Sequence, residues 1–282
     1  MAVPHESARA RSGELSIHFR QLGAPGALPI LIVHGLSYFS YDWLPVARAL
    51  ASERQVIAMD MRGFGDSDWS PSKDYSVPAM AGDVLAVLDH VRWPRAVLVG
   101  HSMGGRSAAY VAAKYPERAA GLALVDYTPE NAPAGGRRVT ETVGNQPDAF
   151  PSVEAAMQYF GKGERARFEA YLRKSAAGYL PKRDLYFRDQ FRRVLQTGER
   201  PQPGVDMWQV LAEVRCPVLS LRGARSDMYA ADTVPKMKAA NPRIRVVEVP
   251  GAGHDVAGDN PEGLVAALAS FLQEYTHEHA RR

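Results

Sequence analysis

The chain has 282 residues, enough for one large domain or two small ones, and 46% of them are hydrophobic, which supplies a substantial core. Its 34 basic and 31 acidic residues leave a formal charge of +3, so the overall charge does not indicate binding to nucleic acid or to a membrane. A single cysteine, Cys216, excludes a disulfide within the chain and fits a reducing compartment. The first residues lack an apolar signal segment, and no apolar run approaches the roughly 18 residues of a membrane span. The sequence therefore predicts a cytoplasmic protein.

The first predicted element is an antiparallel edge hairpin, because residues 14–20 alternate between apolar and polar side chains. Apolar runs bounded by glycine or proline then predict strands at 30–33, 56–59, 96–99, 122–125, 218–221 and 246–249. Amphipathic helical patterns lie between them, for example over Val77–Val91 and from Pro261 to about Tyr275. Near-continuous apolar strands that alternate with such helices predict a parallel sheet covered on both faces.

The alternation stops over residues 128–206, which show helical patterns at 153–160, 165–174 and 185–195 and no convincing strand. We expect a helical lid there, with residues 1–127 and 207–282 forming the core domain. Residues 137–200 carry 13 Lys and Arg against 8 Asp and Glu, a balance of +5. Two interpretations are open: a solvated helical face, or an electropositive lid that attracts anionic substrates.

The most informative motif is Gly100-His101-Ser102-Met103-Gly104. It follows the strand expected at 96–99 and opens a helix-compatible run that ends before Pro116. This is the strand, sharp turn and helix of a nucleophile elbow, in which a strained turn presents the serine hydroxyl to a base. Ser102 is therefore the predicted nucleophile.

A serine nucleophile needs a histidine base and an acid that orients the base. His254 lies in a glycine-rich loop after the last expected strand, where its ring can reach the carboxyl edge of the sheet. Asp227, just past the preceding strand, is the predicted acid, and Asp126 at the end of the strand before that is its rival. Asp255 is too near His254 to turn back on it.

The developing oxyanion of the transition state needs hydrogen-bond donors. The backbone amides of Leu36, after His34-Gly35, and of Met103, after the nucleophile, are the predicted donors. The polar turn from Asp60 to Ser67 contains Gly-x-Gly, but it lacks the glycine and lysine of a phosphate-binding loop, so we interpret it as structural. No residue pattern predicts a metal site.

These motifs together resemble the α/β-hydrolase superfamily over nearly the whole chain. The marks are His34-Gly35, the segment from Asp60 to Ser67, Gly100-x-Ser102-x-Gly104, Asp227 and Gly253-His254. The resemblance implies an α/β fold with an eight-stranded, mostly parallel sheet, helices on both faces, a helical lid inserted after strand six, and no cofactor. It does not fix the reaction, because this fold hosts many hydrolases and even hormone receptors.

Within that superfamily, epoxide hydrolases and haloalkane dehalogenases use an aspartate nucleophile, and residue 102 is serine. Ser37 also stands where the epoxide hydrolases have a proline. Three segments, Arg106, Lys114–Pro116 and Asp126–Pro129, are similar to parts of the hydrolases that cleave a C–N bond in the dicarboxylate 2-(acetamidomethylene)succinate.

We therefore expect a serine hydrolase that cleaves a small carboxylic ester or lactone. Two alternatives are open: hydrolysis of a C–N or C–C bond in an acidic small molecule by the same triad, and slow-turnover ligand binding. Arg106 needs an anionic partner, either Asp126 or a substrate carboxylate. The other expected substrate contacts are Tyr38, Tyr127, Arg137 and Arg138. The expected partner is a small molecule, and a homodimer is left open.

Overall fold

The computed structural model describes residues 5–161, 163–199 and 204–279. An eight-stranded sheet forms the centre, with the strand order β1-β2-β4-β3-β5-β6-β9-β10. The amino-terminal pair β1–β2 is antiparallel, β2 joins β4 antiparallel, and the remaining pairs are parallel. The strands are β1 (Glu6–Ser12), β2 (Leu15–Leu22), β3 (Ile30–Val33), β4 (Val56–Met59), β5 (Ala96–His101), β6 (Ala119–Val125), β9 (Val218–Gly223) and β10 (Ile244–Val249). The edge hairpin and the mostly parallel sheet expected from the sequence are confirmed.

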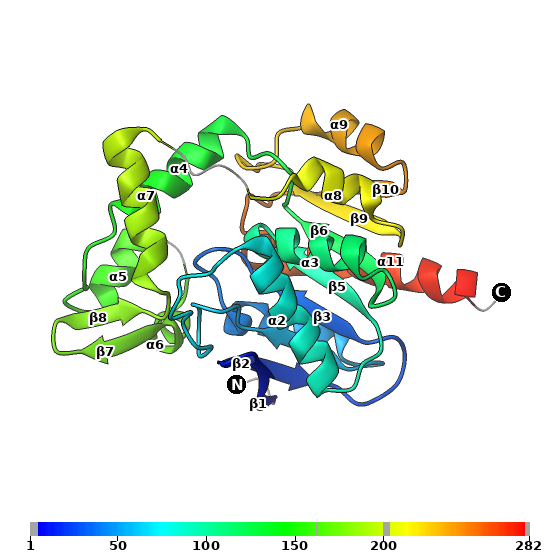
Figure 1. Cartoon of the computed structure of the whole chain (residues 1–282), viewed down its shortest axis with the longest axis horizontal. Coiled ribbons are helices and arrows are strands. Elements are labelled where there is room, and N and C mark those ends of the chain that lie inside the picture. Colours follow the sequence, from blue (N-terminus) through cyan, green and yellow to red (C-terminus); the bar gives the residue numbers. More distant parts are fainter. Residues whose placement is uncertain (1–4, 162, 200–203, 280–282) are drawn as a thin grey trace.

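Both faces of the sheet are covered, and strand β3 shows why its sequence is apolar throughout. Leu31 and Val33 pack into one hydrophobic cluster, whereas Ile30 and Ile32 pack into the cluster on the opposite face. A strand between two helical layers has no polar side, so the run Ile-Leu-Ile-Val is apolar at every position. Figure 1 views the sheet with α2, α3 and α8 in front of it.

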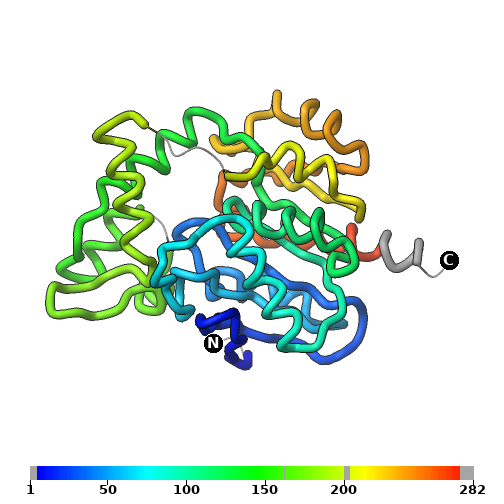
Figure 2. Tube along the Cα trace, in the orientation of Figure 1, coloured from blue at the N-terminus to red at the C-terminus, as the bar shows by residue number. Residues whose placement is uncertain are grey.

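Helices α2, α3 and α11 begin close to the residues expected from the sequence, and the other helices of the two layers were not predicted. One layer holds α2 (Val77–His90), α3 (Met103–Lys114), α8 (Met207–Glu213) and α9 (Thr233–Ala240). The other holds η1 (Ser40–Trp43), α1 (Leu44–Leu50), α10 (Val256–Asp259) and α11 (Pro261–His279). Figure 2 shows the trace of β1 and β2 at one edge of the sheet and that of β9 and β10 at the other, as the strand order requires.

Between β6 and α8, the chain leaves the sheet and forms a separate group of elements, to the left in Figure 1. These are α4 (Pro133–Gly144), α5 (Val153–Phe160), α6 (Arg165–Tyr171), β7 (Leu172–Ser175), β8 (Gly178–Pro181) and α7 (Leu185–Thr197). A small apolar core that includes Phe150, Phe168 and Tyr171 holds part of the group together. We call it the insertion.

The expectation that the insertion contains no strand is wrong. Helix α6 ends at Tyr171, and residues 172–181 form the antiparallel hairpin β7–β8. Tyr179 and Phe150 exchange two backbone hydrogen bonds of 2.8 Å, which tie the hairpin to the preceding segment. The strands are short, and the exposed Arg173 and Lys174 give them no alternating apolar pattern, so the sequence carries little signal for them.

In the described part of the chain, no helix has the length and apolar character that crossing a bilayer requires.

Candidate active site

Ser102 occupies a strained turn between β5 and α3. Its φ of 49° and ψ of −116° lie outside the regions that L-residues ordinarily adopt. The turn is possible because its neighbours are glycines: a Cβ at Gly104 would lie 2.3 Å from the carbonyl oxygen of Val33, and one at Gly100 would lie 2.7 Å from that of Gly104. The glycines therefore allow β5 and α3 to approach closely, and the half-buried Ser102 lines a large cavity.

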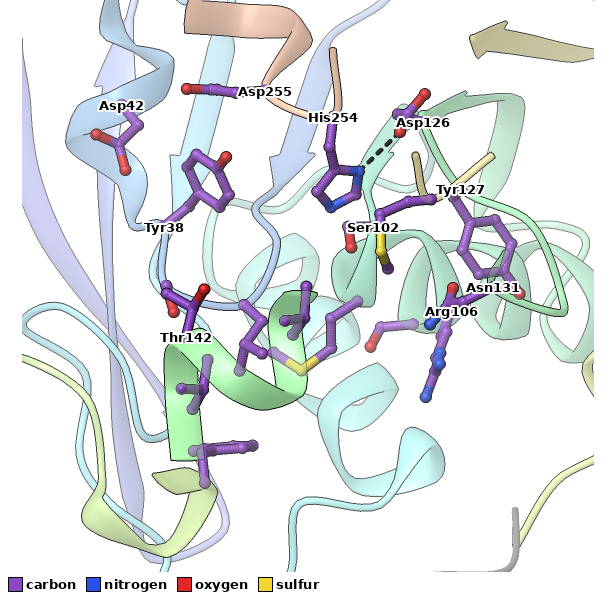
Figure 3. Close-up of a pocket in the computed structure, with 18 of the residues that line it drawn as sticks. Tyr38, Asp42, Ser102, Arg106, Asp126, Tyr127, Asn131, Thr142, His254 and Asp255 are labelled. Atoms are coloured by element: carbon purple, nitrogen blue, oxygen red, sulfur yellow. Dashed lines mark hydrogen bonds and ion pairs between the residues drawn. The ribbon is translucent and has the colours of Figure 1, made fainter. Parts of the chain in front are cut away.

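His254 follows β10 in the loop before α10, and its ring lies beside Ser102 (Figure 3). The Nδ1 atom lies 2.7 Å from Oδ2 of Asp126, and the second ring nitrogen points to the side on which Ser102 lies. The His254 backbone carbonyl accepts a 2.9 Å hydrogen bond from Nε2 of His101. Burial lowers the pKa of His101 well below its ordinary value, so this support stays neutral.

Asp126 is the carboxylate that contacts the ring of His254, and further hydrogen bonds fix its position. It follows β6 with a φ of 44°, and its side chain is 0% exposed. Its oxygens also accept a 2.9 Å hydrogen bond from the backbone N–H of Gly223 and a 2.5 Å bond from the hydroxyl of Ser226. A buried carboxylate with these donors stays in place and can stabilise a positive imidazole.

The expected contact between Asp227 and His254 is not formed, which corrects the sequence interpretation. Asp227 instead accepts two hydrogen bonds from Arg138 of α4, of 2.5 and 2.7 Å. Its backbone carbonyl also accepts a 2.9 Å bond from the N–H of Gly135. The Arg138 hydrogen bond lowers the pKa of Asp227, to which the nearby His254 adds a smaller effect. Asp227 thus binds the insertion, and Asp126, the expected rival, holds the imidazole.

The two expected oxyanion donors lie on either side of the same turn. A Cβ on Gly35 would lie 3.0 Å from the Cβ of Ser102, so the loop that carries Leu36 runs directly against the elbow. Met103 is the first residue of α3, where a helix leaves its N–H groups without internal partners. Neither backbone N–H donates a hydrogen bond to any of the described residues. Both residues line the cavity.

The cavity has a volume of about 2190 Å³ and lies between the carboxyl edge of the sheet and the insertion. Among the expected substrate contacts, Arg106, Tyr38, Tyr127 and Arg138 line it. Arg137 is exposed and does not line it, and Arg138 is engaged by Asp227. The expected pairing of Arg106 with Asp126 is also absent, because hydrogen bonds from His254, Ser226 and Gly223 occupy that carboxylate.

Sequence reasoning missed two arginines beside the loop that carries Leu36. Arg183 of the insertion is 2% exposed and donates hydrogen bonds to the Ser37 hydroxyl and the Gln146 side chain. Arg167 pairs with Asp42 at 2.8 Å. Neither lies in a motif, and the only signal was the excess of basic residues over 137–200.

One group of side chains outside the cavity has the spacing of metal ligands: His18, Asp60 and Asp66. Asp60 already accepts hydrogen bonds from the His18 ring and from the backbone N–H groups of Ser40 and Asp66. Burial alone would raise its pKa, but the hydrogen bond and charge of His18, the nearby His34 and the Asp66 N–H lower it to about 2. We therefore assign the group a structural role. Burial raises the pKa of the Cys216 thiol to about 12, so this thiol is no nucleophile at neutral pH.

Comparison with known proteins identifies the family of the chain. The model of the family described as alpha/beta hydrolase fold matches residues 29–261. The chain is 29% identical over 273 residues to 2-(acetamidomethylene)succinate hydrolase of Mesorhizobium japonicum, covering 94% of this chain and 95% of that protein. It is 30% identical over 268 residues to sn-1-specific diacylglycerol lipase ABHD11 of Xenopus laevis, covering 87% and 80%. The crystal structure of E-2-(acetamidomethylene)succinate hydrolase superposes with a TM-score of 0.83 at 26% identity, covering 96% of this chain and 100% of that one.

Proposed function

Because the chain belongs to the α/β-hydrolase fold family, we propose that it is a serine hydrolase that cleaves a carboxylic ester or lactone through an acyl-enzyme. The observation that carries the proposal is the buried hydrogen bond of 2.7 Å between Asp126 and His254, beside a serine in a strained elbow. A histidine with a purely structural role does not need a serine in a strained turn beside it. The cavity also gives a substrate access to Ser102 and His254. The lone cysteine and small net charge favour a cytoplasmic enzyme with a small-molecule substrate.

The first half of the reaction forms the acyl-enzyme. The Ser102 hydroxyl oxygen attacks the substrate carbonyl carbon while Nε2 of His254 takes the hydroxyl proton. Asp126 keeps the proton of His254 on Nδ1 and stabilises the imidazolium that results. The tetrahedral intermediate then expels the alkoxide, which receives the proton from Nε2 and leaves as an alcohol.

The backbone N–H groups of Leu36 and Met103 bind the negative oxygen of the tetrahedral intermediate. Loss of one such donor typically costs about 10²- to 10³-fold in rate. In the second half of the reaction, water takes the place of Ser102 as the nucleophile. It gives a proton to His254, attacks the acyl carbon and releases the acid, and Ser102 recovers its proton. Residues 128–206, which we propose act as a lid, exclude bulk water from these steps.

A second candidate is hydrolysis of a C–N bond in an acidic small molecule by the same residues. One observation favours it: Arg106 lines the cavity and has no anionic partner among the described residues. The similarity to a hydrolase of 2-(acetamidomethylene)succinate points the same way. The nucleophile, base and acid are unchanged, and the leaving group becomes an amine.

The test measures turnover by pH-stat titration on a panel of ethyl esters, γ- and δ-lactones and N-acyl amino acids. We expect hydrolysis of at least one class, and Ser102→Ala should reduce its rate by roughly 10³-fold or more, since triad members act as one unit. Thermal unfolding of both proteins controls for folding. Tight binding of panel compounds without turnover would indicate a ligand-binding protein instead, and activity in Ser102→Ala would remove the nucleophile assignment.

A further inference from the structure

Arg106 is distinctive among the cations that line the cavity. The other lysines and arginines of the described lining each have an acceptor within the protein: Lys73 binds Asp184, Arg138 binds Asp227, Arg167 binds Asp42 and Arg225 binds the carbonyl of Gly251. Arg106 has neither an ion pair nor a hydrogen bond to any described residue. A half-buried guanidinium without an acceptor is costly unless an anion or water completes it.

Tyr127 also lines the cavity and carries a second unpaired donor, a hydroxyl whose oxygen is shielded from solvent. Tyr127 is 3% exposed and lines the cavity, yet its hydroxyl oxygen has no hydrogen-bond partner. Its ring packs on the first turn of α3, because a Cβ on Gly105 would lie 2.6 Å from its Cγ. Burial raises the pKa of the phenol, and the charge of Arg106 opposes that rise, so the two side chains are electrostatic neighbours. The phenol stays protonated at neutral pH and can only gain by donating its proton to an acceptor.

Both donors are attached to the backbone beside the proposed catalytic residues. Arg106 lies in the first turns of α3, four positions after Ser102, which directly precedes that helix, and both residues line the cavity. Tyr127 directly follows Asp126. Figure 3 shows Arg106 and Tyr127 on one side of Ser102 and Tyr38 on the other. A group bound by Arg106 and Tyr127 can therefore belong to the molecule whose carbonyl Ser102 attacks.

We propose that Arg106 and Tyr127 form a subsite for a carboxylate, so that the preferred substrate is an acyl compound carrying a second, ionised acid group a few bonds from the cleaved carbonyl. This inference rests on the proposed serine hydrolysis and names its substrate class. One guanidinium balances one negative charge, and its planar fork with an added hydroxyl matches the oxygens of a carboxylate. The protein's own candidates for this place are engaged, since Asp126 holds His254 and Glu130 pairs with Lys236 at 2.7 Å.

The test compares acidic and neutral esters of matched size. Ethyl hydrogen succinate, glutarate and adipate are paired with ethyl butanoate, pentanoate and hexanoate, and kcat and KM are measured by pH-stat. The wild-type enzyme should prefer one acidic ester over its neutral partner. Arg106→Met should reduce that preference by about 10- to 150-fold, mainly through KM, because a hydrogen-bonded charge is lost. Tyr127→Phe should reduce it by roughly 3- to 10-fold, and Arg106→Lys should lie between Arg106→Met and the wild type.

Arg193→Met is the matched control, because Arg193 is an exposed arginine of the insertion that does not line the cavity. This variant should keep the wild-type preference for the acidic ester. A wild-type enzyme without preference for any acidic ester, or a preference that survives Arg106→Met, would overturn the subsite.

The subsite can also fail or hold independently of catalysis. Calorimetric titration of the Ser102→Ala protein with glutarate and adipate measures binding alone. Binding that weakens with Arg106→Met in that background supports the subsite even if the wild-type enzyme cleaves none of the esters. Absence of binding, or binding that is unchanged by Arg106→Met, overturns the subsite. In that case, ester hydrolysis by the wild-type enzyme would still support the serine mechanism.

Discussion

Asp126→Asn should nearly abolish turnover, because Asp126 is the only carboxylate that contacts the imidazole of His254 among the described residues. The side chain is 0% exposed and accepts hydrogen bonds from His254, Ser226 and Gly223. An amide can present N–H to the Nδ1 atom, which favours the wrong tautomer and leaves no proton acceptor at Nε2. By analogy with other triads, the loss in kcat is about 10⁴-fold. Loss of one charge-assisted hydrogen bond should also lower the free energy of unfolding by about 1–3 kcal/mol.

Asp227→Asn is the matched comparison, since it makes the same chemical change in the other acid near His254. Its pair with Arg138 is bidentate, but the two side chains are 34% and 49% exposed, so its loss should cost less than about 1 kcal/mol of stability. Asp227 also lies close enough to His254 for their charges to interact. The expected loss in kcat is therefore below about tenfold, or about 1.4 kcal/mol of activation free energy.

The assay is kcat on the best substrate of the panel, with denaturant unfolding of each variant. A larger loss in Asp227→Asn than in Asp126→Asn would transfer the role of the acid to Asp227 and refute the reasoning from the buried hydrogen bonds.

Three further predictions concern the structure that supports the site. Ser37→Ala should lower the free energy of unfolding by about 1–3 kcal/mol, because the buried Arg183 loses a hydrogen-bond acceptor. The same substitution should cost much less in an Arg183→Met background, and equal costs in the two backgrounds would show that Ser37 and Arg183 are not coupled. The pKa of Asp60 falls from 3.8 unfolded to about 2 in the native state, so its contribution of roughly 2 kcal/mol is present above pH 4 and lost as the pH falls toward 2. Denaturant titrations across that pH range should show that the free energy of unfolding falls more steeply in the wild type than in Asp60→Asn. Parallel pH dependences in the two proteins would contradict the lowered pKa of Asp60. Gly104→Ala should destabilise the protein by more than about 4 kcal/mol or prevent folding, because the new Cβ would lie 2.3 Å from a backbone oxygen. Gly82→Ala in α2 is the control, and it should raise the melting temperature slightly because there is open space around Gly82. Similar melting temperatures for the two variants would show that the elbow tolerates a side chain at residue 104.

The parts of the fold that the sequence predicted are those with a local physical signature. Continuous apolar runs marked β3 and β4 to the residue, because a strand buried on both faces has no polar positions. The glycines around Ser102 marked the elbow, because no other residue fits between β5 and α3. The hairpin β7–β8 lacked such a signature, since its strands have four residues each and show no alternation of buried and exposed positions.

The acid of the site was harder to predict, because two strand ends offer an aspartate to the same histidine. Asp126 and Asp227 each follow a strand near His254, and the choice between them depends on contacts between distant segments. Arg138, 89 positions from Asp227, draws that carboxylate toward α4, whereas Ser226 and Gly223 fix Asp126. Such pairings follow from the placement of the insertion, which local patterns do not specify. The unpaired state of Arg106 likewise follows only from the contacts around it.

The most direct test of the account is covalent labelling of the native enzyme with diethyl 4-nitrophenyl phosphate, an irreversible phosphorylating agent for activated serines, followed by mass spectrometry of the intact chain and its peptides. The account predicts one diethylphosphoryl group, carried by Ser102, that is absent from Ser102→Ala and greatly slowed in Asp126→Asn. An adduct on another residue, an equal adduct in Ser102→Ala, or no adduct in an enzyme that hydrolyses esters would contradict the claim that Ser102 is an activated nucleophile.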